Sequence, residues 1–156
     1  MPDLNLGSLT ITSSSFEPGG PIPDRHAASG ADVPPQLQWS GVPDGTVELA
    51  LVVHDPDAPL VDGFTHWVVH GIAPDTDGVG EDGFAEGTAV VGPNETGEAA
   101  YMGPAPPPDH GPHHYFFHLY ALDQDLGDEP LTRAELLDRM EGHILEQARV
   151  VGTFRA

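Results

Sequence analysis

The segment most informative about this chain is Gly103-Pro104-Ala105-Pro106-Pro107-Pro108-Asp109-His110-Gly111-Pro112-His113-His114-Tyr115, which leads into an aromatic run ending at Leu122. Five prolines fall within residues 103–112, so this loop loses little conformational entropy when it orders and suits a preformed rim. The run His113–Leu122 predicts a strand, because aromatic residues favour extended backbone. Alternation along that strand places His113 and Tyr115 on one face and His114 on the other.

Two further strands are predicted upstream of this segment. Glu48–His54 contains a continuous apolar run, Leu49–Val53, which is typical of a strand buried on both faces. His66–Ile72 is a second strand of the same kind. Regular alternation predicts that one of its faces carries His66, Val68, His70 and Ile72.

One helix is expected after these strands. Thr132 and Glu135 match a capping box. The apolar residues that then recur at helical spacing are Leu136, Leu137, Met140, Ile144, Leu145 and Ala148. Val150–Phe154 predicts a closing strand. The expected fold class is therefore mainly β, with one late helix and long Pro/Gly-rich loops, in a single domain that spans residues 1–156.

The charge of the chain is its most unusual bulk property. There are 25 acidic residues against 5 basic ones, Lys is absent, and the formal net charge is −20. Acidic surfaces without Lys are similar to those of proteins from salt-accumulating halophiles. Nucleic acids and anionic membranes are disfavoured as partners, because both require a basic surface.

Absent residue types and segments narrow the function classes further. The chain has no Cys, which excludes disulfides, thiolate nucleophiles and Cys-ligated metals. The stretch Met1–Asn5 shows no signal-peptide pattern. No apolar run approaches the ~18 residues needed to span a bilayer. We therefore expect a cytoplasmic protein without stable membrane insertion.

Polar residues gather where the strong strands begin or end. Asp55-Pro56-Asp57-Ala58-Pro59 follows the first strand, and His66 opens the second. Asp55 and Asp57 point the same way if this stretch is extended, although an Asp-Pro turn that only caps the strand is the better explanation of this motif taken alone. An imidazole and a phenol side by side, as in His113 and Tyr115, are donors suited to an oxyanion.

These segments together resemble the phosphatidylethanolamine-binding proteins, which include the Raf kinase inhibitor proteins. The resemblance rests on Asp55–Pro59, on His66-Trp67-Val68-Val69 and on Gly103–Tyr115, and it covers roughly residues 8–155 in the form of the bacterial and archaeal branch. It implies two antiparallel sheets with a small surface pocket for phosphate-like groups, and it makes a homodimer plausible. The pocket residues it implies are Asp55, Asp57, His66, Ala105, Pro106, Pro107, His113 and Tyr115.

The hypothesis we favour is a protein that binds a phosphate-like anion, or a small molecule or protein that carries one, in a regulatory role. The alternative is a hydrolase or another acid–base enzyme that uses the Asp, His and Tyr side chains. A metal site is disfavoured, since on a strand His113 faces away from His114 and His118, and no cofactor is implied. Because two carboxylates repel an anion, we expect Asp55 and Asp57 either to orient and charge His66 or His113 or to accept hydrogen bonds from loop N–H groups. An Asp partner raises the pKa of a His, so we expect tighter binding at mildly acidic pH.

The charge leads to a first prediction, that cooperative folding requires high salt. At molar salt the Debye length falls to ~3 Å, so repulsion among the acidic side chains largely disappears. Circular dichroism across a potassium chloride series measures this dependence. Full cooperative folding at low ionic strength would contradict the prediction.

Overall fold

Two antiparallel β-sheets organise residues 7–156, the part of the chain that this computed structural model describes. The larger sheet has the strand order β6-β4-β3-β7-β8 and the smaller one β1-β2-β5. The strands of the larger sheet are β3 (Glu48–Asp55), β4 (Phe64–Ile72), β6 (Val90–Val91), β7 (His113–Leu122) and β8 (Ile144–Phe154). Those of the smaller sheet are β1 (Thr10–Thr12), β2 (Leu37–Ser40) and β5 (Gly78–Val79). The stretch Met1–Asn5 lies outside the described residues.

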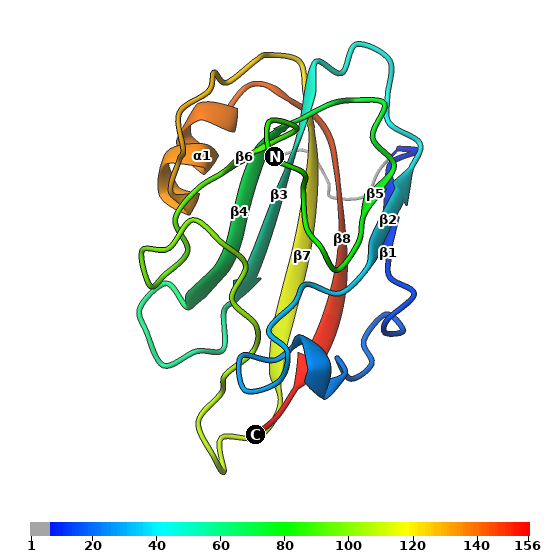
Figure 1. Cartoon of the computed structure of the whole chain (residues 1–156). Helices are drawn as coiled ribbons and strands as arrows, with labels where there is room; N and C mark the ends of the chain where they lie inside the picture. Colours follow the sequence, from blue (N-terminus) through cyan, green and yellow to red (C-terminus); the bar gives the residue numbers. More distant parts are fainter. Residues whose placement is uncertain (1–6) are drawn as a thin grey trace.

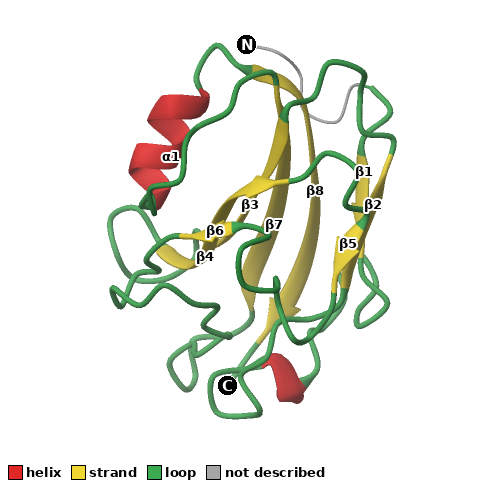
Figure 2. Ribbon diagram, turned by 45° about the horizontal axis from the view of Figure 1, so that its top comes forward, coloured by secondary structure: helices red, strands yellow, loops and turns green. Residues whose placement is uncertain are grey.

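The elements form three layers (Figures 1 and 2). The smaller sheet packs on one face of the larger sheet, and helix α1 (Arg133–Met140) covers part of the other face. A 3-10 turn, η1 (Asp24–His26), lies near the end of β8 (Figure 1). The mainly β class with two antiparallel sheets is thus confirmed.

The central strand β3 is buried along its whole length, as its continuous apolar run predicts. Leu49, Leu51 and Val53 join the core between the two sheets, which also holds Trp39 of the smaller sheet. Ala50 and Val52 face the opposite way and pack in a second cluster with Leu136 and Met140 of α1. Burial on both faces explains why this strand has no polar alternation.

The helix is shorter than the sequence pattern predicts. Its N-terminus is confirmed as a capping box. The Thr132 hydroxyl accepts from the Glu135 N–H, and the Glu135 carboxylate accepts from the Thr132 N–H. The expected continuation is wrong: α1 ends at Met140, and the residues Ile144, Leu145 and Ala148 belong to β8. Gly142, with φ of 81°, breaks the helical backbone. Pairing of the following residues with β7 then replaces the helical periodicity.

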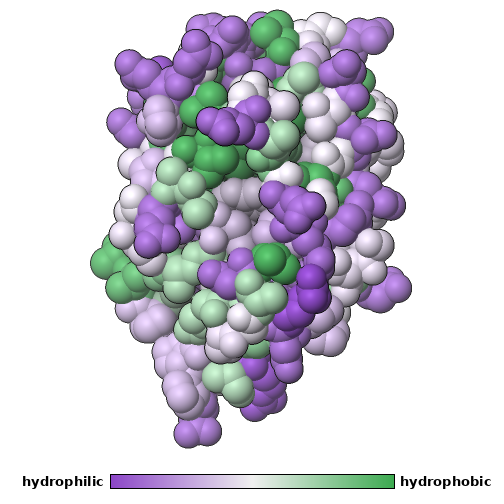
Figure 3. Space-filling model, in the orientation of Figure 1, coloured by the Kyte–Doolittle hydropathy of each residue, from purple (hydrophilic) through white to green (hydrophobic). Residues whose placement is uncertain are grey.

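The surface on the side shown in Figure 3 is largely hydrophilic, with small, separate hydrophobic areas. Among the described residues, no helix has the length and apolar character required to cross a bilayer.

A buried ion pair ties the segment before α1 to the larger sheet. The Glu48 carboxylate accepts hydrogen bonds from the backbone N–H groups of Gly71 and Leu126. His70 donates from Nε2 to the Glu129 carbonyl at 2.8 Å, while its Nδ1 lies 3.5 Å from the Glu48 carboxylate. Both partners of His70 only accept, so a doubly protonated ring satisfies both. Burial alone lowers the pKa of His70, but the nearby Glu48 carboxylate and the hydrogen bond to the Glu129 carbonyl outweigh burial and raise that pKa above its ordinary value.

We therefore predict that the contribution of His70 to stability is lost as the pH rises. A raised pKa in the folded state stabilises the protein fully below the unfolded-state pKa of about 6.5, and this gain disappears as the pH passes the folded-state value. The measurement is urea unfolding at fixed molar salt for the wild type and His70→Gln. The Gln amide keeps a donor for Glu129 but carries no charge. The stability difference should shrink with rising pH, and a constant or growing difference would disprove the assignment.

Candidate functional site

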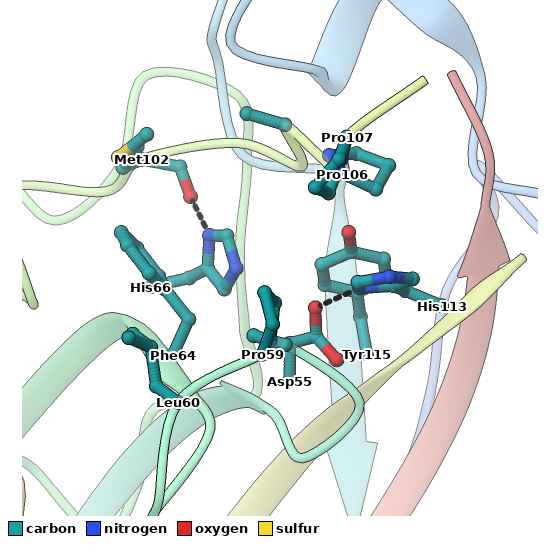
Figure 4. Close-up of a pocket in the computed structure, with 12 residues that line it drawn as sticks. Asp55, Pro59, Leu60, Phe64, His66, Met102, Pro106, Pro107, His113 and Tyr115 are labelled. Atoms are coloured by element: carbon teal, nitrogen blue, oxygen red, sulfur yellow. Dashed lines mark hydrogen bonds and ion pairs between the residues drawn. The ribbon is translucent and has the colours of Figure 1, made fainter. Parts of the chain in front are cut away.

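A cavity of about 250 Å³ opens at the end of the larger sheet where β3 ends and β4 and β7 begin. Figure 4 shows its polar side chains, Asp55, His66, His113 and Tyr115, around one space. Seven of the eight residues predicted for the site line it, and Asp57 does not. The complete lining is Asp55, Ala58, Pro59, Leu60, Phe64, His66, Met102, Ala105, Pro106, Pro107, His113 and Tyr115.

A β-bulge turns His66 into the cavity. Val53 pairs with Trp67 and His54 with Thr65, so His66 is an extra residue between two pairs. Trp67 faces the core between the sheets, and regular alternation would turn His66 to the opposite face with Val68. The expectation that His66 shares a face with Val68 and His70 is therefore wrong. A bulge re-aims a side chain in this way, commonly beside functional sites.

The orientation of His66 is fixed by the residue before the proline-rich loop. Its Nδ1 donates to the Met102 carbonyl at 2.7 Å, and the Met102 N–H donates back to the His66 carbonyl at 3.0 Å. Because a carbonyl only accepts, Nδ1 carries the proton in the neutral ring. Nε2 is turned toward the side of Asp55 and Tyr115 (Figure 4).

Burial lowers the pKa of His66, and the hydrogen bond to Met102 opposes this effect only in part. The expectation that an aspartate charges His66 is therefore not met. Asp55 forms its side-chain hydrogen bonds with His113 and with the Asp57 N–H instead. His66 therefore presents the Nε2 side of its ring to the cavity (Figure 4).

His113 lies in a chain of hydrogen bonds at the other side of the cavity. Its Nδ1 donates to the Asp55 carboxylate at 2.6 Å, and both side chains are buried. Its Nε2 is 2.7 Å from Nδ1 of His110. Since both ring nitrogens have partners within the chain, His113 shapes the wall of the cavity.

The Tyr115 hydroxyl points toward Pro106 from the floor of the cavity (Figure 4). Its ring meets the His66 ring edge-on at a centroid distance of 5.2 Å. Burial first, and then the negative charges of Asp55 and Asp57, raise the pKa of Tyr115 well above its ordinary value. The hydroxyl therefore keeps its proton and is available as a donor.

Asp57 lies outside the cavity, on the exposed side of the same loop. Its carboxylate accepts from the backbone N–H and from Nδ1 of His114, at 2.8 and 2.7 Å. This arrangement confirms that His114 faces away from His113 and Tyr115. Slight burial raises the pKa of Asp57, but the hydrogen bonds from His114 outweigh it and hold that pKa below its ordinary value.

The proline-rich rim is fastened to the segment around η1. Tyr101 donates its hydroxyl to the His26 carbonyl, and the Gly103 N–H donates to the Asp32 carboxylate at 2.7 Å. Position 103 requires glycine, because a Cβ there would overlap the His26 carbonyl oxygen. Within residues 104–108 only Ala105 has a backbone N–H, so the rim offers few donors.

The apolar wall of the cavity was not predicted from the sequence. Ala58, Pro59, Leu60, Phe64 and Met102 line it, and the Phe64 and His66 rings lie 4.7 Å apart. A signal existed for Phe64, which stands two residues before His66 and therefore shares its face. Met102 lines the cavity because its loop folds back onto β4. The periodicity of the sequence cannot reveal a contact between such distant segments.

Among the residues that the structure describes, those that line the cavity include no Lys or Arg. Among residues 7–156, no group of three or more His, Asp or Glu side chains is arranged to hold a metal ion.

The fold and the cavity define a class of small two-sheet β-proteins with a pocket at one end of the larger sheet. A family model described as phosphatidylethanolamine-binding protein matches residues 12–155, and the chain belongs to this family. A UPF0098 protein of Methanothermobacter thermautotrophicus is 40% identical over 152 residues, which cover 94% of this chain and 99% of the relative.

Solved structures of two bacterial members are similar throughout. The phosphatidylethanolamine-binding protein homologue CT736 from Chlamydia trachomatis has a TM-score of 0.89 and 37% identity, covering 97% of this chain and 99% of that one. The YbcL protein of E. coli has a TM-score of 0.87 and 29% identity, with 96% and 99% covered. The family expected from the sequence motifs is thus confirmed.

Removal of Asp55 should destabilise the protein far more than removal of Asp57. Asp55→Ala leaves a buried N–H of His113 without its partner, which costs about 3 kcal/mol. Asp57→Ala removes an exposed pair with His114 and costs at most about 1 kcal/mol. Urea unfolding at fixed molar salt measures both changes. Equal losses would show that the Asp55–His113 bond does not stabilise the fold as the geometry indicates.

Proposed function

We propose that the cavity binds a small phosphate-like anion, either free phosphate or a phosphate group on a small molecule or protein, and that the protein acts through this binding. The observation that carries the proposal is that Tyr115 and His66 line one small cavity, with their ring centroids 5.2 Å apart. A phenol donor and an imidazole are groups that bind oxyanions. The family is named for binding a lipid whose head group contains phosphate, which agrees with this chemistry.

The apolar wall suits the organic part of such a ligand. Pro59, Leu60 and Phe64 line one side of the cavity, and the Leu60 side chain is also exposed at the surface. Apolar walls with a few placed polar groups are the usual composition of small-molecule sites. We therefore expect a phosphorylated compound with an apolar group to bind better than inorganic phosphate.

A second candidate, an acid–base enzyme, is favoured by one observation. The hydrogen-bonded series Asp55–His113–His110 is similar to the orienting part of a catalytic triad. However, His113 has both ring nitrogens engaged, and no Ser, Thr or Cys lines the cavity to serve as a nucleophile. Hydrolysis of phosphoesters or peptides that His66→Ala abolishes would favour this candidate over simple binding.

Replacement of Tyr115 by Phe should weaken phosphate binding about five- to tenfold, because a net hydrogen bond of about 1 kcal/mol is lost. The substitution removes only one oxygen. The measurement is an NMR titration of the full chain with inorganic phosphate at constant chloride, at mildly acidic and at neutral pH.

Tyr120→Phe is the matched control, because Tyr120 lies on the same strand but packs on the opposite face with the α1 cluster. It should leave phosphate binding unchanged. Absence of phosphate binding by the wild type at both pH values, or equal weakening by the two variants, would refute the proposed site.

A further inference from the structure

Two histidine rings meet at the edge of the cavity, and the hydrogen bonds of the buried ring fix the positions of their protons. Nδ1 of His113 lies 2.6 Å from the Asp55 carboxylate, which only accepts, so this nitrogen carries a proton. In a neutral His113, Nε2 is therefore a lone pair, and Nδ1 of His110, 2.7 Å away, must donate to it. The series Asp55–His113–His110 thus runs from a buried carboxylate to an exposed ring.

This series of side chains is able to take up one proton without moving. A proton from solvent that binds Nε2 of His110 makes that exposed ring a cation, and the proton on its Nδ1 then passes to Nε2 of His113. One N–H bond forms at Nε2 of His110, and one N–H bond is transferred from His110 to His113, so the pair gains one proton and one positive charge. A second proton would set two N–H groups against each other at 2.7 Å and place two like charges side by side.

The added proton changes the charge of the cavity wall. Asp55 and His113 both line the cavity, and the described residues of that lining include no Lys or Arg. While His113 is neutral, the wall carries the negative charge of Asp55, which repels an anion. A proton on the pair offsets this charge, and it rests on His113 because a neighbouring carboxylate favours the charged form of an imidazole.

We propose, on the basis of the proposed function, that His110 and His113 form one proton-sharing pair, which takes up a proton when the cavity binds a phosphate group. His113 lines the cavity, whereas His110 lies outside the lining and acts through His113 as a positioning residue. The pair thereby supplies the positive charge that no Lys or Arg of the lining provides.

The charged and titratable groups around the pair are mostly acidic. They are Asp55 at the end of β3, Asp57 and Asp109 in the flanking loops, Tyr115 on the same strand as His113, and His66 across the cavity. On β8 the residue opposite His113 is the uncharged Phe154, and Arg155 follows it in the sequence. The three carboxylates favour a positive charge on the pair, and the two cationic residue types oppose it.

The test uses methyl phenyl phosphate, a diester that has no second proton to lose, so any proton taken up on binding goes to the protein. Calorimetry of the full chain at constant chloride, in buffers with different heats of ionisation, measures this uptake at several pH values on both sides of the ordinary imidazole pKa of about 6.5. We expect the uptake to pass through a maximum of at most about one proton per ligand. Ring nitrogen NMR signals should show His113 becoming an imidazolium and the proton of His110 moving from Nδ1 to Nε2.

The variant His110→Asn separates the shared proton from the placement of the loop. Its amide still meets Nε2 of His113 but binds no proton. At neutral pH it should bind the diester about fivefold more weakly, because an imidazole holds the charged N–H of His113 more strongly than a neutral amide does. The ratio of the two affinities should fall toward one at about pH 5, where an imidazole of ordinary pKa is protonated without help. A loop that is only displaced would weaken binding equally at every pH.

His114→Asn is the matched control. His114 follows His113 in the sequence but faces away from it and pairs with Asp57 outside the cavity. Its replacement should leave both the proton uptake and the affinity for the diester unchanged.

The possible results are distinguishable. Binding without proton uptake at any pH, or uptake that protonates His66 and leaves both rings of the pair unchanged, would overturn the pair and leave the proposed function standing. Weakening by His110→Asn that is equal at every pH, or matched by His114→Asn, would overturn the role of His110. Inorganic phosphate is the second probe, for which the nitrogen signals of the two rings decide. Failure of both probes to bind would refute the proposed function and this inference together.

Discussion

The buried hydrogen bond between Asp55 and His113, at 2.6 Å, is the interaction on which the site depends. It joins the last residue of β3 to the first residue of β7, so it closes the end of the larger sheet and forms one wall of the cavity. Both side chains are almost fully buried, and neither is tolerated there without the other because an unpaired charge in the interior is costly. The other carboxylate oxygen accepts from the Asp57 N–H and shapes the loop that follows. The Asp55–His113 hydrogen bond thus holds one wall of the cavity in place.

The second half of the site results from a local irregularity in the sheet. The bulge at His66 turns that ring away from the α1 side and toward Tyr115. Reciprocal hydrogen bonds between His66 and Met102 then hold the chain just before the proline-rich loop against β4. Prolines make the rim stiff, but they also remove backbone donors from it. The same two features therefore explain both the rigidity of the cavity and its shortage of hydrogen-bond donors.

The shortage of hydrogen-bond donors bears on the role of Asp55 and Asp57. A carboxylate beside an anion would repel it, and the sequence led us to expect that Asp55 and Asp57 charge His66 or His113 or accept from loop N–H groups. The structure pairs Asp55 with His113, one of the expected partners, whereas Asp57 lies outside with His114 and His66 is buried with a lowered pKa. Charge complementarity is therefore weak in this cavity.

The amino-acid sequence alone determined the mainly β class, the strands β3, β4 and β7, the capped start of α1, the family and seven of the eight lining residues that it named. These features follow from local patterns and motifs, which act over a few residues. Only the tertiary structure decided four other features. They are the end of α1, the direction of His66, the position of Asp57 outside the cavity, and the apolar wall with Met102. Each depends on contacts between distant segments: β8 with β7, β4 with β3, Asp57 with His114 of β7, and the loop with β4. Such pairing overrides local periodicity, because a one-residue bulge reverses the direction of a side chain without altering the sequence pattern.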